Sequence, residues 1–254
     1  MIVFHYDKTF EGLLTAVFDA YNRNVFPDKL LGVNELEPLF IDESFAVITD
    51  TTKSERVWKG LEKKVAAITL NILSYVWLSE TPSCDELLFR YIRKTFDSKT
   101  SIEMNFVDDD VLQIRTIAQK VNREKHRLIE FVRFQKTADG MFFAPVAPDH
   151  NALPLTLEHF SDRFADQQWI IYDIKRDYGY HYDLNKTTEI RLDSDTLFPE
   201  GKVNEDLLDS DEKLFQQMWK SYFTSMTIKE RINPALHRKN LPRRFWKYLT
   251  EKQP

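Results

Sequence analysis

The chain has 254 residues, of which 43% are hydrophobic and 30% charged, so it can bury one large core or two smaller ones and is not a disordered chain. Its formal net charge of -5 argues against nucleic-acid binding through overall charge and leaves only a local basic patch open. The single cysteine, Cys84, excludes an internal disulfide and any cysteine-rich metal or iron–sulfur site made by this chain alone. No cofactor is expected. Without a long apolar run or a secretory signal, the sequence predicts a cytoplasmic protein that does not enter a membrane.

The first part of the chain, residues 1–107, is predicted to be a mixed α/β and helical region. The segment "IVFHY" has the character of a short strand, and the helix pattern of "TFEGLLTAVFDAY" follows with Thr9 as N-cap. The stretch to about residue 44 is expected to be mostly loop, before a second strand at "SFAVIT". Apolar residues then recur every three or four positions over residues 54–79, which predicts one long helix, and a further helix follows "TPSCDE".

The second part, residues 108–254, begins with a helix at "DDD", where negative charge complements the helix dipole. Five short aromatic and β-branched segments then have strand character: "IEFVRFQ", "GMFFAPVA", "QWIIYDI", "GYHYDL" and "TEIRL". Only "LPLTLEHFSDRF" among them is helical, which gives the order ββαβββ. We therefore predict an α+β protein whose antiparallel sheet is covered by helices. An acidic connection, residues 193–212, leads to a helical basic and aromatic tail, residues 228–254.

The stretch "REKHRLIEFVRF" joins the charged end of this helix to the first predicted strand of the sheet. His126 lies at the edge of the apolar helix face, whereas Arg127 points away from it. In the strand, Arg133 shares a face with Phe131, so its guanidinium could bind a phosphate or a carboxylate of a ligand. It could equally pair with Glu130 or another acid inside the protein, and both alternatives remain open.

Further polar candidates lie in the predicted sheet region. His126 or His150 could act as a general acid or base, with Asp149 or Asp173 as the carboxylate. Candidate ligand-binding residues in the same region are Arg163 and Arg176. The histidine spacings match no zinc motif, so no metal site is predicted. The alternative is an ordinary half-buried sheet whose aromatic residues form the core while the charges face water.

Cations and aromatic residues are interleaved in the tail. Arg238, Arg243 and Arg244 could neutralise phosphates, and Trp246 could stack on a base. The alternative is an amphipathic helix that docks its aromatic residues into the core and leaves the arginines in solvent. The sequence contains no G-x-x-x-x-G-K-[ST], no G-x-G-x-x-G and no G-x-S-x-G motif.

Several stretches together resemble a known family: "YDKTFEGLLTAVFDAY", "VITDTTKSERV", "HRLIEFVRF" with the later "PDH" and "HFSDRF", "WIIYDIKRDYGYHY", and "WKSYFTSMTIKERINPALHRKNLPRRFWKYLTE". The family is bacterial and is described as one of DNA metabolism proteins that contain a domain of unknown function. The resemblance implies a radical-SAM protein as genomic neighbour and partner, thought to modify or repair DNA. It also implies a link to uracil-DNA glycosylase-like proteins, to which a related domain is fused.

The resemblance singles out positions that locate a surface but assign no mechanism, because the family has no established catalytic residues. These positions are Asp7, Phe10, Glu11, Gly12, His126, Arg127, Arg133, Phe134, His150, Phe160, Arg163, Trp169, Arg176, Trp219, Tyr222, Arg231, Asn233, Pro242 and Trp246. Lys8 departs from the pattern, since a glycine is expected there, and the first turn is expected to be less tight than in relatives.

The main hypothesis is an accessory protein in DNA repair or DNA modification that binds DNA, a radical-SAM partner or both. In this hypothesis one polar surface is formed by His126, Arg127, Arg133, Arg163 and Arg176. Phosphate contacts and stacking come from Arg238, Arg243, Arg244 and Trp246. Two alternatives stay open: a glycosylase-like hydrolase acting on DNA or nucleosides through a histidine and an aspartate, and a protein-interaction module whose arginines hold helices onto the sheet. Whether the protein is an enzyme is open at this point.

Overall fold

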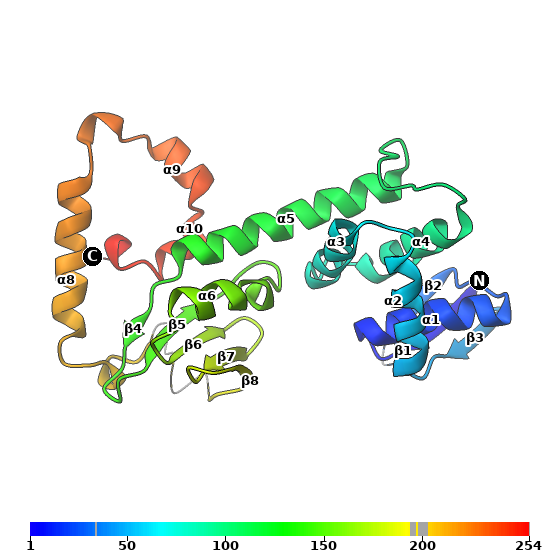
Figure 1. Ribbon diagram of the computed structural model, residues 1–254, viewed down its shortest axis with the longest axis horizontal. Coiled ribbons are helices and arrows are strands. Elements are labelled where there is room, and N and C mark those ends of the chain that lie inside the picture. Colours follow the sequence, from blue (N-terminus) through cyan, green and yellow to red (C-terminus); the bar gives the residue numbers. More distant parts are fainter. Residues whose placement is uncertain (34, 194–196, 198–202, 254) are drawn as a thin grey trace. The chain divides into compact units, whose positions relative to one another are not determined.

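The computed structural model describes residues 1–33, 35–193, 197 and 203–253 (Figure 1). The chain forms two compact units, Met1–Asn122 and Arg123–Pro254, called unit 1 and unit 2 below. Unit 1 combines a small parallel sheet with helices, and unit 2 holds a mainly antiparallel five-stranded sheet. The predicted α+β class is thereby confirmed. In the part of the chain that is described, no helix has both the length and the apolar character needed to cross a bilayer.

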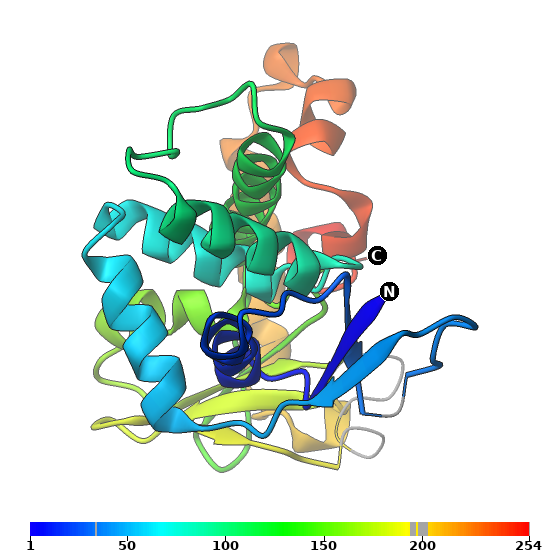
Figure 2. The same ribbon diagram turned by 90° about the vertical axis from the view of Figure 1, so that its right-hand side faces the viewer.

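The sheet of unit 1 consists of three parallel strands in the order β2-β1-β3. They are β1 (Ile2–Tyr6), β2 (Lys29–Gly32) and β3 (Glu43–Ala46). The helix α1 (Phe10–Arg23) packs against β1 (Figure 2), and its N-cap is Thr9, whose hydroxyl accepts from the Gly12 amide. The strand at "IVFHY" and the Thr9 cap are confirmed, whereas β2 falls in a stretch that was expected to be mostly loop.

The long helix predicted over residues 54–79 is wrong, because the structure has two helices there. They are α2 (Thr51–Glu62) and α3 (Ala67–Leu78), and α4 (Cys84–Asp97) follows as predicted. The backbone is extended at Ala66, the residue before α3, which has no side-chain cap of its own. The carboxylate of Glu103 takes over this role, accepting from the Ala66 amide at 3.1 Å and from the Thr69 hydroxyl. A distant acid thus stabilises a helix start that local periodicity does not reveal.

The helix α5 (Asp109–Phe131) begins at the aspartate run as predicted and continues further than expected. The strand predicted at "IEFVRFQ" is therefore mostly wrong, since only β4 (Gln135–Lys136) is extended. The reason is the helical spacing of Val121 and Leu128, both fully buried, which keeps the helix face directed inward as far as Phe131.

Unit 2 contains one sheet in the order β4-β5-β6-β7-β8. Its other strands are β5 (Phe142–Val146), β6 (Trp169–Asp173), β7 (Tyr178–Tyr182) and β8 (Thr187–Ile190). Between β5 and β6 the chain crosses over through η1 (Leu153–Thr156) and α6 (Leu157–Arg163), which makes this one pair parallel and the others antiparallel. The predicted ββαβββ order is confirmed, with β6 as a completely buried central strand.

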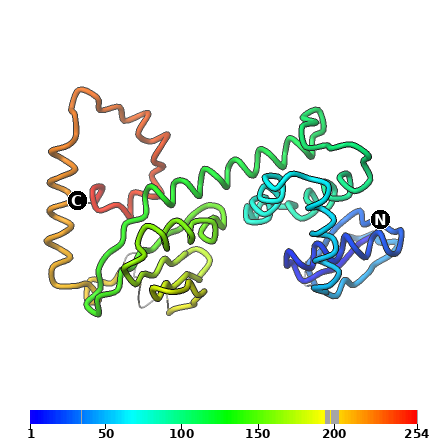
Figure 3. Tube along the Cα trace, in the orientation of Figure 1, coloured from blue at the N-terminus to red at the C-terminus, as the bar shows by residue number. Residues whose placement is uncertain are grey.

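The predicted acidic connection, residues 193–212, lies partly outside the described residues, at positions 194–196 and 198–202. Its described part includes η3 (Glu205–Leu207), after which Leu208 bridges to Thr137. The chain then forms α8 (Glu212–Met226) and returns toward α5 in the path traced in Figure 3. The return segment contains η4 (Lys229–Arg231), α9 (Pro234–Asn240), α10 (Arg243–Trp246) and η5 (Thr250–Lys252).

Candidate functional site: a cation-lined pocket and its surroundings in unit 2

A network of charged groups connects α5, the loop after β5 and α10. At its centre is Glu124, whose side chain is 2% exposed. Its carboxylate accepts from the Asp149 amide at 2.9 Å and pairs with Arg127 at 3.4 Å and with Arg244. The other terminal nitrogen of Arg244 lies 2.7 Å from the Asp149 carboxylate. Sequence reasoning missed Glu124, although its place between Val121 and Leu128 on the buried face was an available signal.

Arg176 extends this network to the end of β6. Its guanidinium lies 2.7 Å from the fully buried carboxylate of Asp173 and donates to the carbonyl oxygens of Pro148 and Asp149, both at 3.1 Å. Burial raises the pKa of Asp173, while the ion pair with Arg176 opposes the rise. The predicted residues Arg127, Arg176 and Arg244 therefore meet internal acids and carbonyl groups, as buried arginines ordinarily do.

The candidate acid–base residues lie around the same network. His126 is exposed on α5, and His150 is partly buried beside Asp149. The carboxylates of Asp149 and Asp173 each form an ion pair with an arginine. Among the residues that the structure describes, no group of three or more histidine, cysteine or acidic side chains is placed to hold a metal ion.

Arg133 lies apart from that network, in the segment between α5 and β4. One of its terminal nitrogens is 3.0 Å from the Glu251 carboxylate, and the other donates to the carbonyl oxygen of Glu130. The indole of Trp219 donates to the second Glu251 oxygen at 2.9 Å, and the Arg133 guanidinium lies 5.6 Å from the Trp219 ring centroid. Burial acts to raise the pKa of Glu251, but hydrogen bonds and the arginine together lower it. Of the two alternatives for Arg133, the structure shows pairing with an internal acid.

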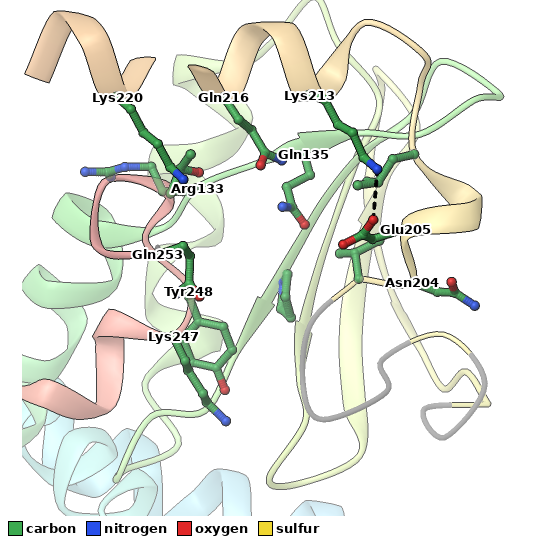
Figure 4. A pocket seen from close by; sticks show the side chains of 14 residues that line it. Arg133, Gln135, Asn204, Glu205, Lys213, Gln216, Lys220, Lys247, Tyr248 and Gln253 are labelled. Atoms are coloured by element: carbon green, nitrogen blue, oxygen red, sulfur yellow. Dashed lines mark hydrogen bonds and ion pairs between the residues drawn. The ribbon is translucent and has the colours of Figure 1, made fainter. Parts of the chain in front are cut away.

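A pocket of about 600 Å³ opens beside Arg133. Figure 4 shows side chains of α8 directed into it from one side and residues of the C-terminal segment entering from the other. Its positive side chains are Arg133, Lys213, Lys220 and Lys247, and its only lining carboxylate among the described residues is Glu205. Amide side chains also line it, at Gln135, Asn204, Gln216 and Gln253. Sequence reasoning found one of these residues, Arg133, because the others belong to separate segments without a shared motif.

The remaining predicted cations lie on the surface. Arg163 on α6, Arg238 on α9 and Arg243 on α10 are all exposed. The guanidinium of Arg243 is 5.8 Å from the ring of Trp246, whose indole donates to the Leu241 carbonyl at 3.1 Å. The tail thus docks in part, with Phe245 and Leu249 buried, and keeps several cations in solvent.

The helix α8 exposes its apolar side chains and turns polar ones toward the pocket. Between 36% and 64% of each of the following residues is exposed: Leu214, Phe215, Met218, Trp219, Tyr222, Phe223 and Met226. By contrast, Lys213, Gln216 and Lys220 point into the pocket (Figure 4). This orientation is the reverse of the usual one for a helix on the surface of a globular protein. We call the seven apolar residues the α8 apolar face.

A family model for a domain of unknown function, DUF4130, matches residues 82–251 of the chain. The matched segment begins just before α4 and includes nearly all of unit 2, with the pocket, the charge network and the α8 apolar face. No curated protein and no solved structure matches the chain. Because the matched segment spans more than half of the sequence, the chain belongs to the DUF4130 family, a domain whose function is unknown.

Proposed function

We propose that this protein is an accessory subunit in DNA repair or DNA modification. It binds a radical-SAM partner enzyme through the α8 apolar face and contacts DNA through exposed cations of its C-terminal tail. The identity of the partner and the link to DNA come from the family resemblance of the sequence. The observation that carries the proposal is the exposure of the α8 apolar face.

Exposed apolar side chains gathered on one helix favour a protein partner. Soluble monomers rarely expose large contiguous apolar patches, and interface centres are enriched in aromatic residues and methionine. The α8 apolar face contains four aromatic residues and two methionines. One of them, Trp219, is already held in place by Glu251, which reduces the entropy that binding would cost. The single cysteine of the chain agrees with a partner that supplies its own cluster ligands.

The exposed cations of the tail support DNA contact. Arg127, Arg176 and Arg244 form ion pairs with internal acids, so these three side chains are poorly placed to neutralise phosphates. Exposed cations of the tail that do not line the pocket are Lys229, Arg231, Arg238, Lys239 and Arg243. Between residues 228 and 249 the tail contains one acidic residue, Glu230. The local charge is therefore strongly positive in an otherwise acidic protein.

The partner is tested by co-purifying the protein with a radical-SAM protein of the kind that the family resemblance implies, after nuclease treatment to remove bridging DNA. Replacing Met218→Lys together with Tyr222→Lys places two charges in the α8 apolar face. We expect at least about tenfold weaker binding, because each lysine must be desolvated in an apolar interface. The matched control is Gln217→Lys, since Gln217 is exposed on the same helix outside that face. Unchanged binding by the double variant would refute the docking proposal.

DNA contact is tested separately by titrating labelled DNA at several salt concentrations, with and without the partner. Arg238→Gln together with Arg243→Gln should reduce the log–log salt slope by about one to two, because each phosphate contact contributes close to one. Lys59→Gln, an exposed lysine of unit 1, serves as control. Binding that is absent, or insensitive to salt, would contradict the DNA part of the proposal and leave the docking part standing.

A further inference from the structure

We propose that the pocket of unit 2 binds a phosphorylated nucleotide unit. The site is distinct from both surfaces of the proposed function: it lies on the opposite side of α8 from the apolar face, and none of Lys229, Arg231, Arg238, Lys239 and Arg243 lines it. Among the described residues, four positive side chains from three parts of the chain line it, against one lining carboxylate, Glu205, while Glu251 pairs with Arg133. In a protein with 40 acidic and 35 basic residues, this is a local reversal of charge that favours an anionic ligand.

The cations are placed so that an anion could reach them. Lys213 and Lys220 are seven residues apart, so about two helical turns, or about 10 Å, separate them on the same face of α8. Lys213 pairs with Glu205 at 2.9 Å, but the side chains are 69% and 76% exposed, and such a pair contributes little and exchanges readily. The ammonium of Lys247 lies 4.7 Å from the Tyr248 ring centroid at the opposite wall.

Arg133 lines the pocket together with the three lysines. Glu251 and two backbone carbonyl groups engage its guanidinium, so its charge is largely balanced within the protein and the three lysines provide the contact to an anion. Lysines bind phosphate as adaptable point charges, and Lys213, Lys220 and Lys247 reach the pocket from α8 and from the C-terminal segment.

The amide side chains of the pocket could recognise a base in addition to the phosphate. Gln216 donates to Glu212 at 3.0 Å, and Gln253 donates to the Trp246 carbonyl at 2.9 Å, so both side chains are held in position. Amide groups can both donate to and accept from the edge of a base, and Pro145, Val203 and Leu208 add apolar wall. The volume of about 600 Å³ lies in the range of small-ligand pockets and suits a nucleotide. The nucleotide could be free in solution or part of a DNA strand.

The test measures equilibrium binding to the whole protein by calorimetry. The probes are a deoxynucleoside 5′-monophosphate, its unphosphorylated deoxynucleoside, inorganic phosphate, and a short single strand with or without a 5′-phosphate. We expect the monophosphate to bind at least about tenfold more tightly than either the nucleoside or inorganic phosphate, since both halves of the ligand are contacted. Tighter binding of the phosphorylated strand identifies a strand end as the source. Equal binding of phosphate and nucleotide, or no binding at millimolar concentration, would overturn the proposal.

Two variants with opposite expected effects separate a lost site from a lost fold. Lys220→Gln together with Lys247→Gln should weaken nucleotide binding at least about tenfold, whereas Lys186→Gln, an exposed lysine between β7 and β8 that does not line the pocket, should not change it. Glu205→Gln removes the one carboxylate among the described lining residues and should strengthen binding about twofold to threefold. A gain of affinity cannot result from misfolding. If neither the double lysine variant nor Glu205→Gln alters nucleotide affinity, the nucleotide binds outside this pocket and the proposal is wrong.

Discussion

Arg133 and Glu251 lie 118 residues apart in the chain and form an ion pair with 3.0 Å between guanidinium and carboxylate. Because Trp219 donates to the same carboxylate, one acidic side chain connects the segment after α5, the helix α8 and the C-terminal segment. Only 5% of the Glu251 side chain is exposed, so the contacts are protected from competing water. Glu251 is thus a central stabilising residue of the part of unit 2 that surrounds the pocket.

Replacing Glu251→Ala should lower the free energy of unfolding by about 2–3 kcal/mol, because Arg133 and Trp219 lose their shared acceptor. The measurement is urea unfolding followed by tryptophan fluorescence. Glu55→Ala is the control, since the Glu55–Lys59 pair is exposed and should contribute no more than about 0.5 kcal/mol. Equal effects of the two substitutions would show that the Glu251 contacts add no stability.

The contribution of Glu251 should depend on pH in the acid range. Its pKa is lowered in the folded protein from an ordinary value of 4.5, so its ionised form stabilises the fold. This stability is fully present above 4.5 and is lost as the pH falls through the lower folded-state pKa. The difference in unfolding free energy between the natural protein and Glu251→Gln should therefore be constant near neutral pH and shrink below 4.5. A difference that grows on acidification would contradict this assignment.

Lys8 occupies the position where the family resemblance leads us to expect a glycine, and its φ of 56° is in the left-handed region. Its ammonium lies 2.7 Å from Asp85, whose pKa is lowered because Lys8 and Tyr6 outweigh the effect of burial. Both Lys8→Gly and Lys8→Ala remove this pair, but only alanine retains the cost of a left-handed backbone. The glycine variant should be about 1 kcal/mol more stable than the alanine variant in thermal or urea unfolding. Equal stability of the two variants would mean that the backbone at position 8 leaves the left-handed conformation in the alanine variant.

Gly179 in β7 should not tolerate a side chain. A Cβ atom there would lie 2.5 Å from the Ile171 carbonyl oxygen and 2.9 Å from the Tyr172 Cα, so the central strands would have to separate. We expect Gly179→Ala to lower the unfolding free energy by about 2–3 kcal/mol. Gly140→Ala is the matched control, because no atom lies within 4 Å and its φ of +85° should cost only about 1 kcal/mol. Comparable losses for both would argue against close packing at Gly179.

Features that depend on neighbouring residues could be predicted from the sequence. The Thr9 cap places the start of α1, and the aspartate run places the start of α5. Strand character and turn residues predict the ββαβββ order of unit 2. In each case the hydrogen bonds or the side-chain alternation that decide the structure lie within a few residues of one another.

Features that depend on distant residues could not be predicted. The break between α2 and α3 is stabilised by Glu103, which is 37 residues from Ala66. The acids that pair with Arg133 and Arg244 are 118 and 120 residues away, so the sequence indicated that such arginines need partners but not which ones. Most of the pocket was missed for the same reason, because its cations come from three separate segments.

The helix α8 packs against the rest of unit 2 on one side only, so its backbone is expected to open more easily than that of a buried strand. Only Glu212 of this helix is buried, whereas every residue of β6 is buried and the strand pairs with β5 and β7. Local opening of α8 therefore exposes little new apolar surface and breaks few tertiary contacts. Its amide hydrogens should exchange with deuterium well before those of β6, and occupation of either face of the helix should slow that exchange.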